Sequence, residues 1–331
     1  YTFANQLSDI YFSLKNNINP KIEPSKNTYI DFINWQKEFV SSAEGGSQMS
    51  YWLDELSGMD SVLDLPTDFQ RRDELSGDSG YYCVNIEGSL VSKVNKYAAK
   101  VEVPLFTLYL SVYHLLLQKY TGKHDLSIGT PTAGRDESFS EVYNYFVNPV
   151  VIRSNVDSSK SVNDYFSLMI DKVKNAFDNK DYPFPLIAEK LNFSRSSNQS
   201  QIFQSTFVWE NINNFNKKEN DLASVGEDGK IFWDLDCLGV WERMNVPQQL
   251  DDFEITFKIY KFRDSFVLGV EYNSDLYKSS TIKRMVDHYF KLIDVISDNN
   301  NCKLSELTLL TENEKNANIS RLSNNIKIVN I

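Results

Sequence analysis

Histidine and cysteine, the side chains of most metal centres, disulfide frames and nucleophilic active sites, are scarce in this sequence. Its 331 residues include 3 cysteines and 3 histidines. The odd number and wide spacing of the cysteines predict free thiols rather than a disulfide frame or a zinc site. The histidines lack metal-ligand spacing and have no carboxylate or nucleophile at a telling distance in sequence, so none identifies itself as a general base. These residues are Cys83, Cys237, Cys302, His114, His124 and His288.

Positive charge is also in short supply. The chain has 34 lysines and arginines against 45 aspartates and glutamates, which gives a net charge of -11. Such a surface repels nucleic acid and anionic lipid, so neither is an expected partner. The GxxxxGK[ST] and GxGxxG phosphate loops and the GxSxG nucleophile turn are missing. The tetrapeptide GDSG at 77–80 resembles a protease nucleophile loop, but no histidine precedes it, and we interpret it as a polar loop.

Long uninterrupted apolar runs are absent as well. The most apolar stretch, residues 103–120, contains Thr107, Ser111, His114 and Gln118, which favours a buried helix over a membrane span. The first residues have no basic region followed by an apolar core, so we expect no signal peptide. A chain that begins at Tyr1 is expected to be a piece of a longer protein, and its expected location is cytoplasmic.

What the sequence does contain is a globular composition with helical periodicity in its first part. Hydrophobic residues make up 41% and aromatic residues 13% of the chain, enough for a sizeable core. Apolar spacing predicts helices over 1–16, 28–42 and 47–57, the last two separated by a break at Gly45 and Gly46. The polar stretch 61–80 is interpreted as a crossover linker.

Beyond residue 80 predicted strands and helices are mixed. Strands are expected at 80–87, 125–130, 145–153, 202–211, 231–236, 252–261 and 265–273, and helices at 89–100, 104–120, 161–178, 184–191 and 279–297. The last two strands form a predicted antiparallel hairpin through Arg263 and Asp264. The strand at 125–130 is expected to break at Gly129 and to turn at Pro131. This pattern predicts an α/β fold with a mixed sheet and helices on its faces.

Several unusual stretches occur in an order that a known family shares. The segments are IGTPTAGR at 128–135, YFVNPVVIR at 145–153, DYPFPLIAEKL at 181–191 and YIDFINWQ at 29–36. They resemble the motifs IGTPxxxR, GxFVNTxxxR, HQDxPFExxxxxL and YxDYAxWQ of the condensation domains of nonribosomal peptide synthetases. The likeness covers nearly the whole chain in order, which makes it specific.

The resemblance implies a fold, a reaction and a set of partners. The fold is a V of two chloramphenicol-acetyltransferase-like lobes. Residues 1–60 would end the N-terminal lobe, 61–80 would cross over, 81–311 would form the C-terminal lobe and 312–331 would lead to an adenylation domain. The reaction joins a donor acyl or peptidyl thioester to an acceptor aminoacyl thioester as an amide. No cofactor is bound directly, because 4′-phosphopantetheine arrives on donor and acceptor carrier proteins, and a hybrid with a polyketide synthase also fits.

The family's HHxxxDG motif, which carries the catalytic histidine, is absent. In the family it directly precedes the helix that matches the first residues here, so no catalytic histidine is identified in this chain, and the missing N-terminal lobe is an expected partner. Arg135 matches the arginine that pairs with the aspartate of HHxxxDG. Asn148 matches the asparagine of FVNT, whose threonine is replaced by Pro149. The expected active-site supports are Gly129, Thr130, Pro131, Arg135 and Asn148.

Other functions remain open at this point. The chain could belong to a catalytically inactive or recruiting condensation-like lobe that only binds partner domains. It could also belong to an ester-forming, cyclising or epimerising relative. A lobe without its partner is further expected to expose a broad apolar face, covered by the upstream lobe or by a second copy.

Overall fold

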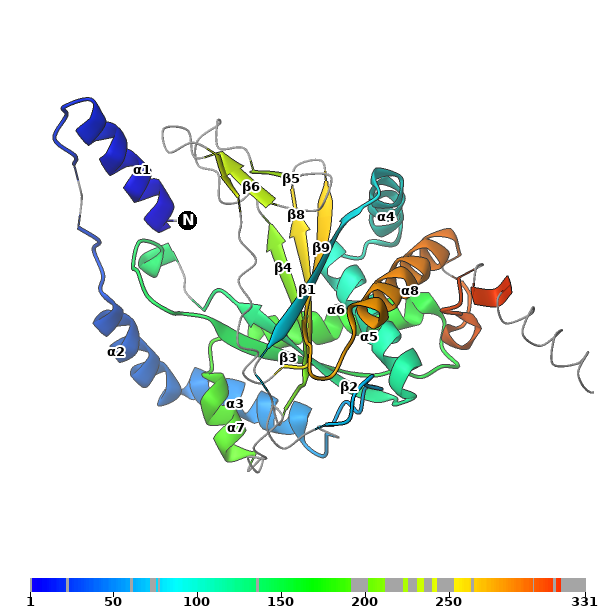
Figure 1. The fold of residues 1–331 in the computed structure, drawn as a ribbon. Helices are drawn as coiled ribbons and strands as arrows, with labels where there is room; N and C mark the ends of the chain where they lie inside the picture. Colours follow the sequence, from blue (N-terminus) through cyan, green and yellow to red (C-terminus); the bar gives the residue numbers. More distant parts are fainter. Residues whose placement is uncertain are drawn as a thin grey trace, which may run out of the picture.

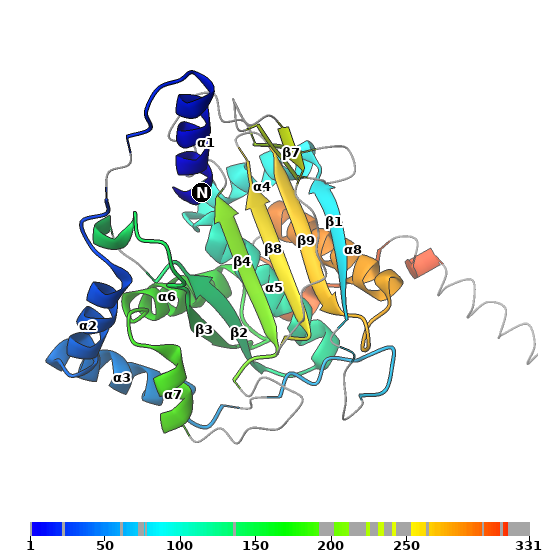
Figure 2. The same cartoon turned by 60° about the vertical axis from the view of Figure 1, so that its left-hand side comes forward.

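A mixed sheet of six strands forms the centre of the molecule, in the order β1-β9-β8-β4-β2-β3 (Figures 1 and 2). Strand β4 runs parallel to β2 and β8, and the other neighbours are antiparallel. The six strands are β1 Ser79–Ile86, β2 Asp125–Thr132, β3 Asn148–Asn155, β4 Ser205–Asn211, β8 Ile255–Lys261 and β9 Phe266–Asn273. A second sheet contains β5 Ala223–Val225, β6 Ile231–Asp234 and β7 Val240–Glu242.

The computed structural model describes only part of the chain. The ranges are 2–21, 24–59, 62–71, 76, 78–134, 137–191, 202–211, 223–225, 231–234, 240–242, 253–262, 265–299, 301–311 and 314–316. Arg135, Cys237, the link at 263–264 and most of 312–331 therefore lie outside the described residues.

Four helices cover one face of the large sheet, while three others lie apart from them at the N-terminal side (Figure 1). The covering helices are α4 Gly88–Val101, α5 Leu105–Thr121, α6 Val162–Asp178 and α8 Ser279–Asp298. The N-terminal helices are α1 Thr2–Lys15, α2 Tyr29–Val40 and α3 Ala43–Leu56. Helix α7 Phe184–Lys190 packs against α3 and β3.

Helix α5 is the centre of the core, because every residue from Thr107 to Gln118 is buried. The Tyr113 ring stacks on Phe257 at 4.3 Å between centroids, and its hydroxyl meets the Ser205 hydroxyl at 2.6 Å. A buried tyrosine that finds a partner for its hydroxyl keeps the gain from apolar burial. The apolar stretch that contains α5 is thus a buried helix, as predicted. Among the described residues, no single helix is both long and apolar enough to cross a membrane.

The predicted break at Gly45 and Gly46 is wrong. Helix α3 runs through both glycines, and the chain turns earlier, where Ser42 caps the helix by accepting a hydrogen bond from the Gly45 amide at 3.0 Å. A Cβ on Gly45 would collide with the backbone carbonyl of Phe39. The glycine therefore permits a close approach of α2 and α3 rather than ending a helix.

The predicted strand break at Gly129 and turn at Pro131 are also wrong. Strand β2 continues to Thr132, and Pro131 lies opposite Pro149 of β3. Proline has no backbone N–H. Two prolines can therefore lie opposite each other only at a position where the two residues do not hydrogen-bond to each other. Strand β3 is also the edge of the sheet, where an absent donor leaves no neighbour unsatisfied. The other predicted helices and strands agree with the structure to within a few residues, whereas β5 and β7 were not predicted. Strands β8 and β9 are antiparallel as expected.

The described residues of 61–80, the predicted crossover linker, form hydrogen bonds to residues next to strands of the large sheet. The Leu63 amide donates a hydrogen bond to the Gln204 side chain at 2.7 Å. Arg71 forms a bidentate ion pair with Glu254, and the Tyr277 hydroxyl donates to the same carboxylate at 3.0 Å. Because Glu254 is only 5% exposed, these partners are what keep its buried charge satisfied.

Candidate functional site

The sequence-predicted support residues come together on two adjacent strands. Gly129, Thr130 and Pro131 lie in β2, and Asn148 begins β3 beside them. Arg135 follows β2 but lies outside the described residues. The residue before it is strongly constrained: Gly134 has φ of +63°, and a Cβ there would collide with the Phe146 carbonyl. A backbone position of this kind suits only glycine.

Gly129 is required by the close approach of an aromatic ring. A Cβ at this position would overlap the ring of Phe203, which is 2% exposed. Phe203 stacks on Phe253 at 5.3 Å and contacts Phe184, the first residue of α7, at 5.6 Å. Thr130 points to the opposite side of the strand and is also buried, at 2% exposure. The β2 part of the site is therefore a closely packed wall.

Asn148 uses its whole side chain to hold a loop. Its amide nitrogen donates to the carbonyls of Lys180 and Tyr182, both at 2.8 Å. Its amide oxygen accepts from the Phe184 amide at 3.0 Å. The described contacts of Asn148 thus connect β3 to the loop between α6 and α7.

Two residues of α3 bind the same loop, and the sequence analysis did not identify them. Gln48 is 4% exposed and Trp52 is 2% exposed, on a face shared with Met49 and Leu56. Polar Gln48 interrupts an otherwise apolar helical face, which was the one available signal. Its partners lie more than a hundred residues further along the chain, so spacing could not reveal them.

A second small core fastens α2 to the segment between β2 and β3. Tyr29, Phe32 and Trp35 form a ladder of stacked rings along α2. Phe32 also packs against Phe139 and Phe146, at 5.4 and 4.7 Å between centroids. The motif resembling YxDYAxWQ therefore positions the described part of this segment, residues 137–148.

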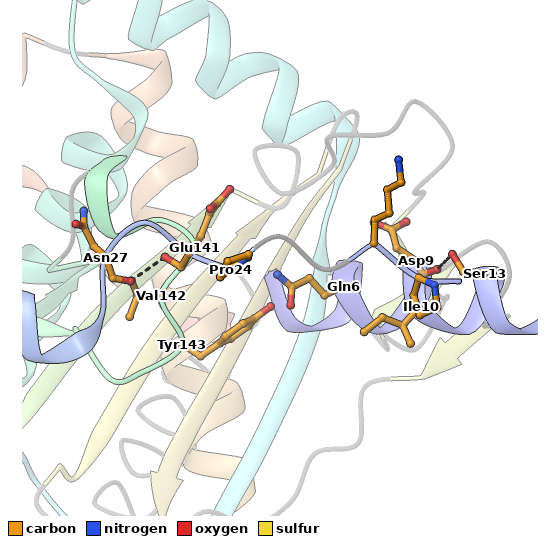
Figure 3. Close-up of a pocket in the computed structure, with 12 residues that line it drawn as sticks. Gln6, Asp9, Ile10, Ser13, Pro24, Asn27, Glu141, Val142 and Tyr143 are labelled. Carbon is orange, nitrogen blue, oxygen red and sulfur yellow. Dashed lines mark hydrogen bonds between the residues drawn. The ribbon is translucent and has the colours of Figure 1, made fainter. Parts of the chain in front are cut away.

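A cavity of about 530 Å³ opens between α1 and this segment (Figure 3). Asp9 and Glu141 contribute acidic groups to its lining, and Tyr143 and Gln6 point toward each other across it. Other lining residues include Ile10, Ser13, Pro20, Lys21, Pro24, Ser25, Asn27 and Val142. With two carboxylates, one lysine and an exposed tyrosine in its lining, the cavity is polar and has one aromatic wall.

Large apolar side chains are exposed on three parts of the chain on the N-terminal side of the site. They lie on α1, on α2 and on the segment between β2 and β3, and their exposure ranges from 37% to 73%. They are Tyr11, Phe12, Leu14, Ile30, Trp35, Tyr143, Tyr145 and Val147. So many large apolar side chains on neighbouring elements indicate an interaction surface.

The three histidines take different structural roles. His114 is completely buried in α5, as expected of a core residue, and burial lowers its pKa to about 3. His124 is exposed, with Nδ1 at 2.7 Å from the Val156 carbonyl. His288 on α8 lies between the Tyr120 hydroxyl and the Glu314 carboxylate, a pairing the local sequence does not show. The described residues contain no group of three side chains that could hold a metal.

Comparison with known proteins identifies the relatives of this chain. The family model "Condensation domain" matches residues 1–318. Bacitracin synthase 1 from Bacillus licheniformis is 31% identical over 290 residues, which is 87% of this chain and 5% of that protein. Polyketide synthase PksN from Bacillus subtilis (strain 168) is 29% identical over 315 residues, 95% of this chain and 6% of that protein. The chain therefore spans a small fraction of the length of these relatives.

Solved structures show the same fold at low sequence identity. The X-domain from teicoplanin biosynthesis superposes with a TM-score of 0.79 at 17% identity, over 93% of this chain and 68% of that one. A four-domain nonribosomal peptide synthetase superposes with a TM-score of 0.76 at 20% identity, over 94% of this chain and 23% of that one. The mixed sheet with its helical layer is thus a chloramphenicol-acetyltransferase-like lobe, and the chain belongs to the condensation domain family.

Proposed function

We propose that this chain forms most of a condensation domain that makes an amide bond in a nonribosomal peptide synthetase or a hybrid with a polyketide synthase. The observation that carries the proposal is the family match over residues 1–318, supported by relatives among both kinds of synthase. The substrates would be a donor acyl or peptidyl thioester and an acceptor aminoacyl thioester. Both would arrive on the 4′-phosphopantetheine arms of carrier proteins, and a neighbouring adenylation domain would load the acceptor.

The reaction transfers the acyl group from sulfur to nitrogen. The acceptor amine attacks the thioester carbonyl, a C–N bond forms, the C–S bond breaks and the amine proton leaves with the donor thiol. The base is expected in an HHxxxDG segment ahead of Tyr1. This chain would contribute the wall that aligns the reactants, built from Gly129, Thr130 and Pro131 with Gly129 packed against Phe203, and alignment alone supplies a large part of the rate.

Arg135 would brace the base from across the lobes by pairing with the aspartate of HHxxxDG. A bidentate pair of arginine and carboxylate is directional and holds a loop in one geometry. Gly134 supports this role, because its left-handed φ and its close approach to the Phe146 carbonyl restrict the backbone directly before Arg135.

The exposed apolar surface on α1, α2 and the adjoining segment would be covered by the N-terminal lobe. The X-domain chain has roughly a third of its length without a counterpart here, enough for most of such a lobe. Burial of the exposed rings would stabilise the assembled domain by about 25 cal/mol for each Å² removed from water.

The test is reconstitution with an upstream extension. The domain, extended upstream to include HHxxxDG, is mixed with a loaded donor carrier and a loaded acceptor carrier, and products are identified by mass spectrometry. We expect an amide-linked product on the acceptor carrier, abolished when the second histidine of the motif is replaced by alanine. An ester, a cyclised product or an epimerised chain would assign one of the related reactions instead.

A recruiting role is the second candidate. The X-domain from teicoplanin biosynthesis, which has the same fold, forms a complex with OxyB. If the extended domain lacks HHxxxDG and makes no product, but binds another enzyme of its synthetase in a pull-down with purified components, this role replaces the catalytic one.

A further inference from the structure

The connection between α6 and α7 receives its hydrogen bonds from an unusual source; we call it the 178–184 loop, counting the last residue of α6 and the first residue of α7. It contains the segment that resembles the family's HQDxPFE motif. Most of its backbone groups that α6 and α7 leave unsatisfied are bound by side chains from distant parts of the chain. Buried backbone groups need such partners, so the donors and acceptors that reach this loop determine its shape.

Helix α3 supplies two of the three side chains. The Gln48 amide oxygen accepts from the backbone amides of Asp181 and Tyr182, at 3.2 and 3.0 Å. Its amide nitrogen donates to the Asp178 carbonyl at 3.4 Å. The Trp52 indole N–H donates to the Asn179 carbonyl at 2.8 Å. Both side chains are buried, so water does not replace these bonds easily.

Strand β3 supplies the third side chain, in a complementary orientation. Asn148 donates to two loop carbonyls and accepts from the Phe184 amide, so its oxygen and nitrogen cannot exchange places without losing every bond. We call Gln48, Trp52 and Asn148 the loop clamp. It joins α3, β3 and the loop into one unit.

The clamped loop reaches the site wall through two aromatic rings. Phe184 ends the loop, and its ring contacts Phe203. Phe203 in turn fills the space next to Gly129 that a side chain would otherwise occupy. A shift of the loop is therefore transmitted to β2 by direct contact, because a closely packed interior has little free space to absorb it.

We propose that the loop clamp is a set of positioning residues for the condensation reaction, and that Asn148 acts through the 178–184 loop rather than on the substrates. This inference rests on the proposed function. Gln48 and Trp52 gain a role in it through their bonds to the loop, although they belong to a helix at some distance along the chain from the site motifs.

The test uses Asn148→Asp, which preserves size and the acceptor for Phe184 but turns a carboxylate oxygen toward two carbonyls. Asn144→Asp is the matched control, since Asn144 is exposed and its side chain accepts a hydrogen bond from the Tyr145 amide. In the extended domain we expect kcat for Asn148→Asp to fall about 10-fold to 100-fold with KM for both carriers within about twofold. The control should stay within about twofold of wild type. Unchanged kcat in Asn148→Asp would overturn the proposal.

Trp52→Phe is the milder variant, because it removes only the indole donor. We expect a kcat loss of about 3-fold to 10-fold without a change in Tm greater than about 3 °C. Full activity in Trp52→Phe would remove Trp52 from the clamp. A kcat loss in either variant that only parallels the loss of folded protein would assign a purely structural role and overturn the proposal.

A measurement without turnover separates this inference from the proposed function. Trypsin cleaves after Lys180, inside the clamped loop. We expect this cleavage to accelerate at least about 10-fold in Asn148→Asp, and slow hydrogen exchange of the Trp52 indole N–H to be lost, while Asn144→Asp matches wild type. If the loop opens but the wild-type domain makes no amide, the proposed function fails and the clamp stands as architecture. If the loop does not open, the clamp itself is wrong.

Discussion

The surroundings of a residue in this fold decide its charge and its role, and His114 is the clearest case. It lies in the most buried helix, and within the described part of the chain neither ring nitrogen has a hydrogen-bond partner. Burial without compensation disfavours the charged form and lowers the pKa to about 3. The residue is therefore a neutral core side chain and not a base.

Replacement of His114 by leucine should flatten the dependence of stability on pH. The unfolded chain has a histidine pKa near 6.5, whereas the folded one is near 3, so the unfolded state binds the extra proton between these values. Stability is then fully present above pH 6.5 and is lost as pH falls toward 3. By linkage the loss approaches about 3 kcal/mol at pH 4.

The measurement is urea unfolding of wild type and His114→Leu at pH 7 and pH 4. The difference between the two proteins isolates this histidine, because the carboxylates titrate in both. We expect the variant to be at least as stable at pH 7 and clearly more stable than wild type at pH 4. Parallel losses in the two proteins would contradict the burial argument.

Gly134 should tolerate alanine much less well than Gly58. Both have a left-handed backbone, with φ of +63° and +62°. Alanine at Gly58 would meet open space and cost about 1 kcal/mol, whereas alanine at Gly134 would also collide with the Phe146 carbonyl and cost about 3 kcal/mol or more. Denaturant midpoints of the two variants decide this, and equal losses would show that the Phe146 contact yields.

Among the structural elements, the segment after α8, described at 301–311 and 314–316, packs against the rest of the fold. The Leu304 amide donates to the Lys160 carbonyl at 2.9 Å, and Leu304 and Leu307 are buried. Further along, Glu314 accepts from the Thr311 amide and hydroxyl, at 2.9 and 2.8 Å, and contacts His288 at 3.0 Å. Burial raises the pKa of Glu314, but the Thr311 and His288 bonds outweigh it and bring the pKa to about 2.

Loss of this contact should free the end of the segment. We expect Glu314→Gln or His288→Ala to accelerate tryptic cleavage after Lys315 at least about 10-fold, with little change in cleavage after exposed Lys21. The folded pKa of Glu314 is depressed, so the protection should persist above its ordinary pKa of 4.5 and disappear as pH falls toward 2. If pepsin does not cleave this segment at pH 2, this account is wrong.

On the scale of the whole molecule, the sheet and its helical layer enclose a buried core, while the N-terminal helices expose large apolar side chains. A surface of this kind is costly in water and is normally covered. The proposed site lies where such a cover would meet β2 and the segment after it. Arg135 is therefore best tested in the extended domain.

We expect Arg135→Ala to lower turnover of the extended domain by about 10-fold to 100-fold, because the aspartate of HHxxxDG would lose a bidentate partner. Arg135→Lys should recover only part of the rate, since an ammonium cannot bind both carboxylate oxygens in the same plane. Exposed Arg284 on α8 offers the control, and Arg284→Ala should retain wild-type turnover. Wild-type turnover of Arg135→Ala at unaltered stability would refute the bracing role.

The order of the main helices and of the six strands of the large sheet, the buried character of α5 and the family itself were determined by the sequence alone, whereas β5 and β7 of the small sheet were not predicted. Periodicity and motif order are local properties, and local preferences act on neighbouring residues. The break at Gly45 and the turn at Pro131 were mispredicted for the same reason, because glycine and proline were interpreted without their spatial neighbours. The Phe39 carbonyl and the opposing Pro149 supply those neighbours.

Only the tertiary structure decided which distant groups meet. Gln48 reaches a loop 130 and more residues away, and His288 finds its carboxylate 26 residues later. Such contacts depend on how whole elements pack, and packing selects partners by shape and by the need to satisfy buried polar groups. Asn148 was identified from a motif, yet its part as one side of a clamp follows from three hydrogen bonds that exist only after β3 has been brought together with the loop before α7 and the first residue of that helix.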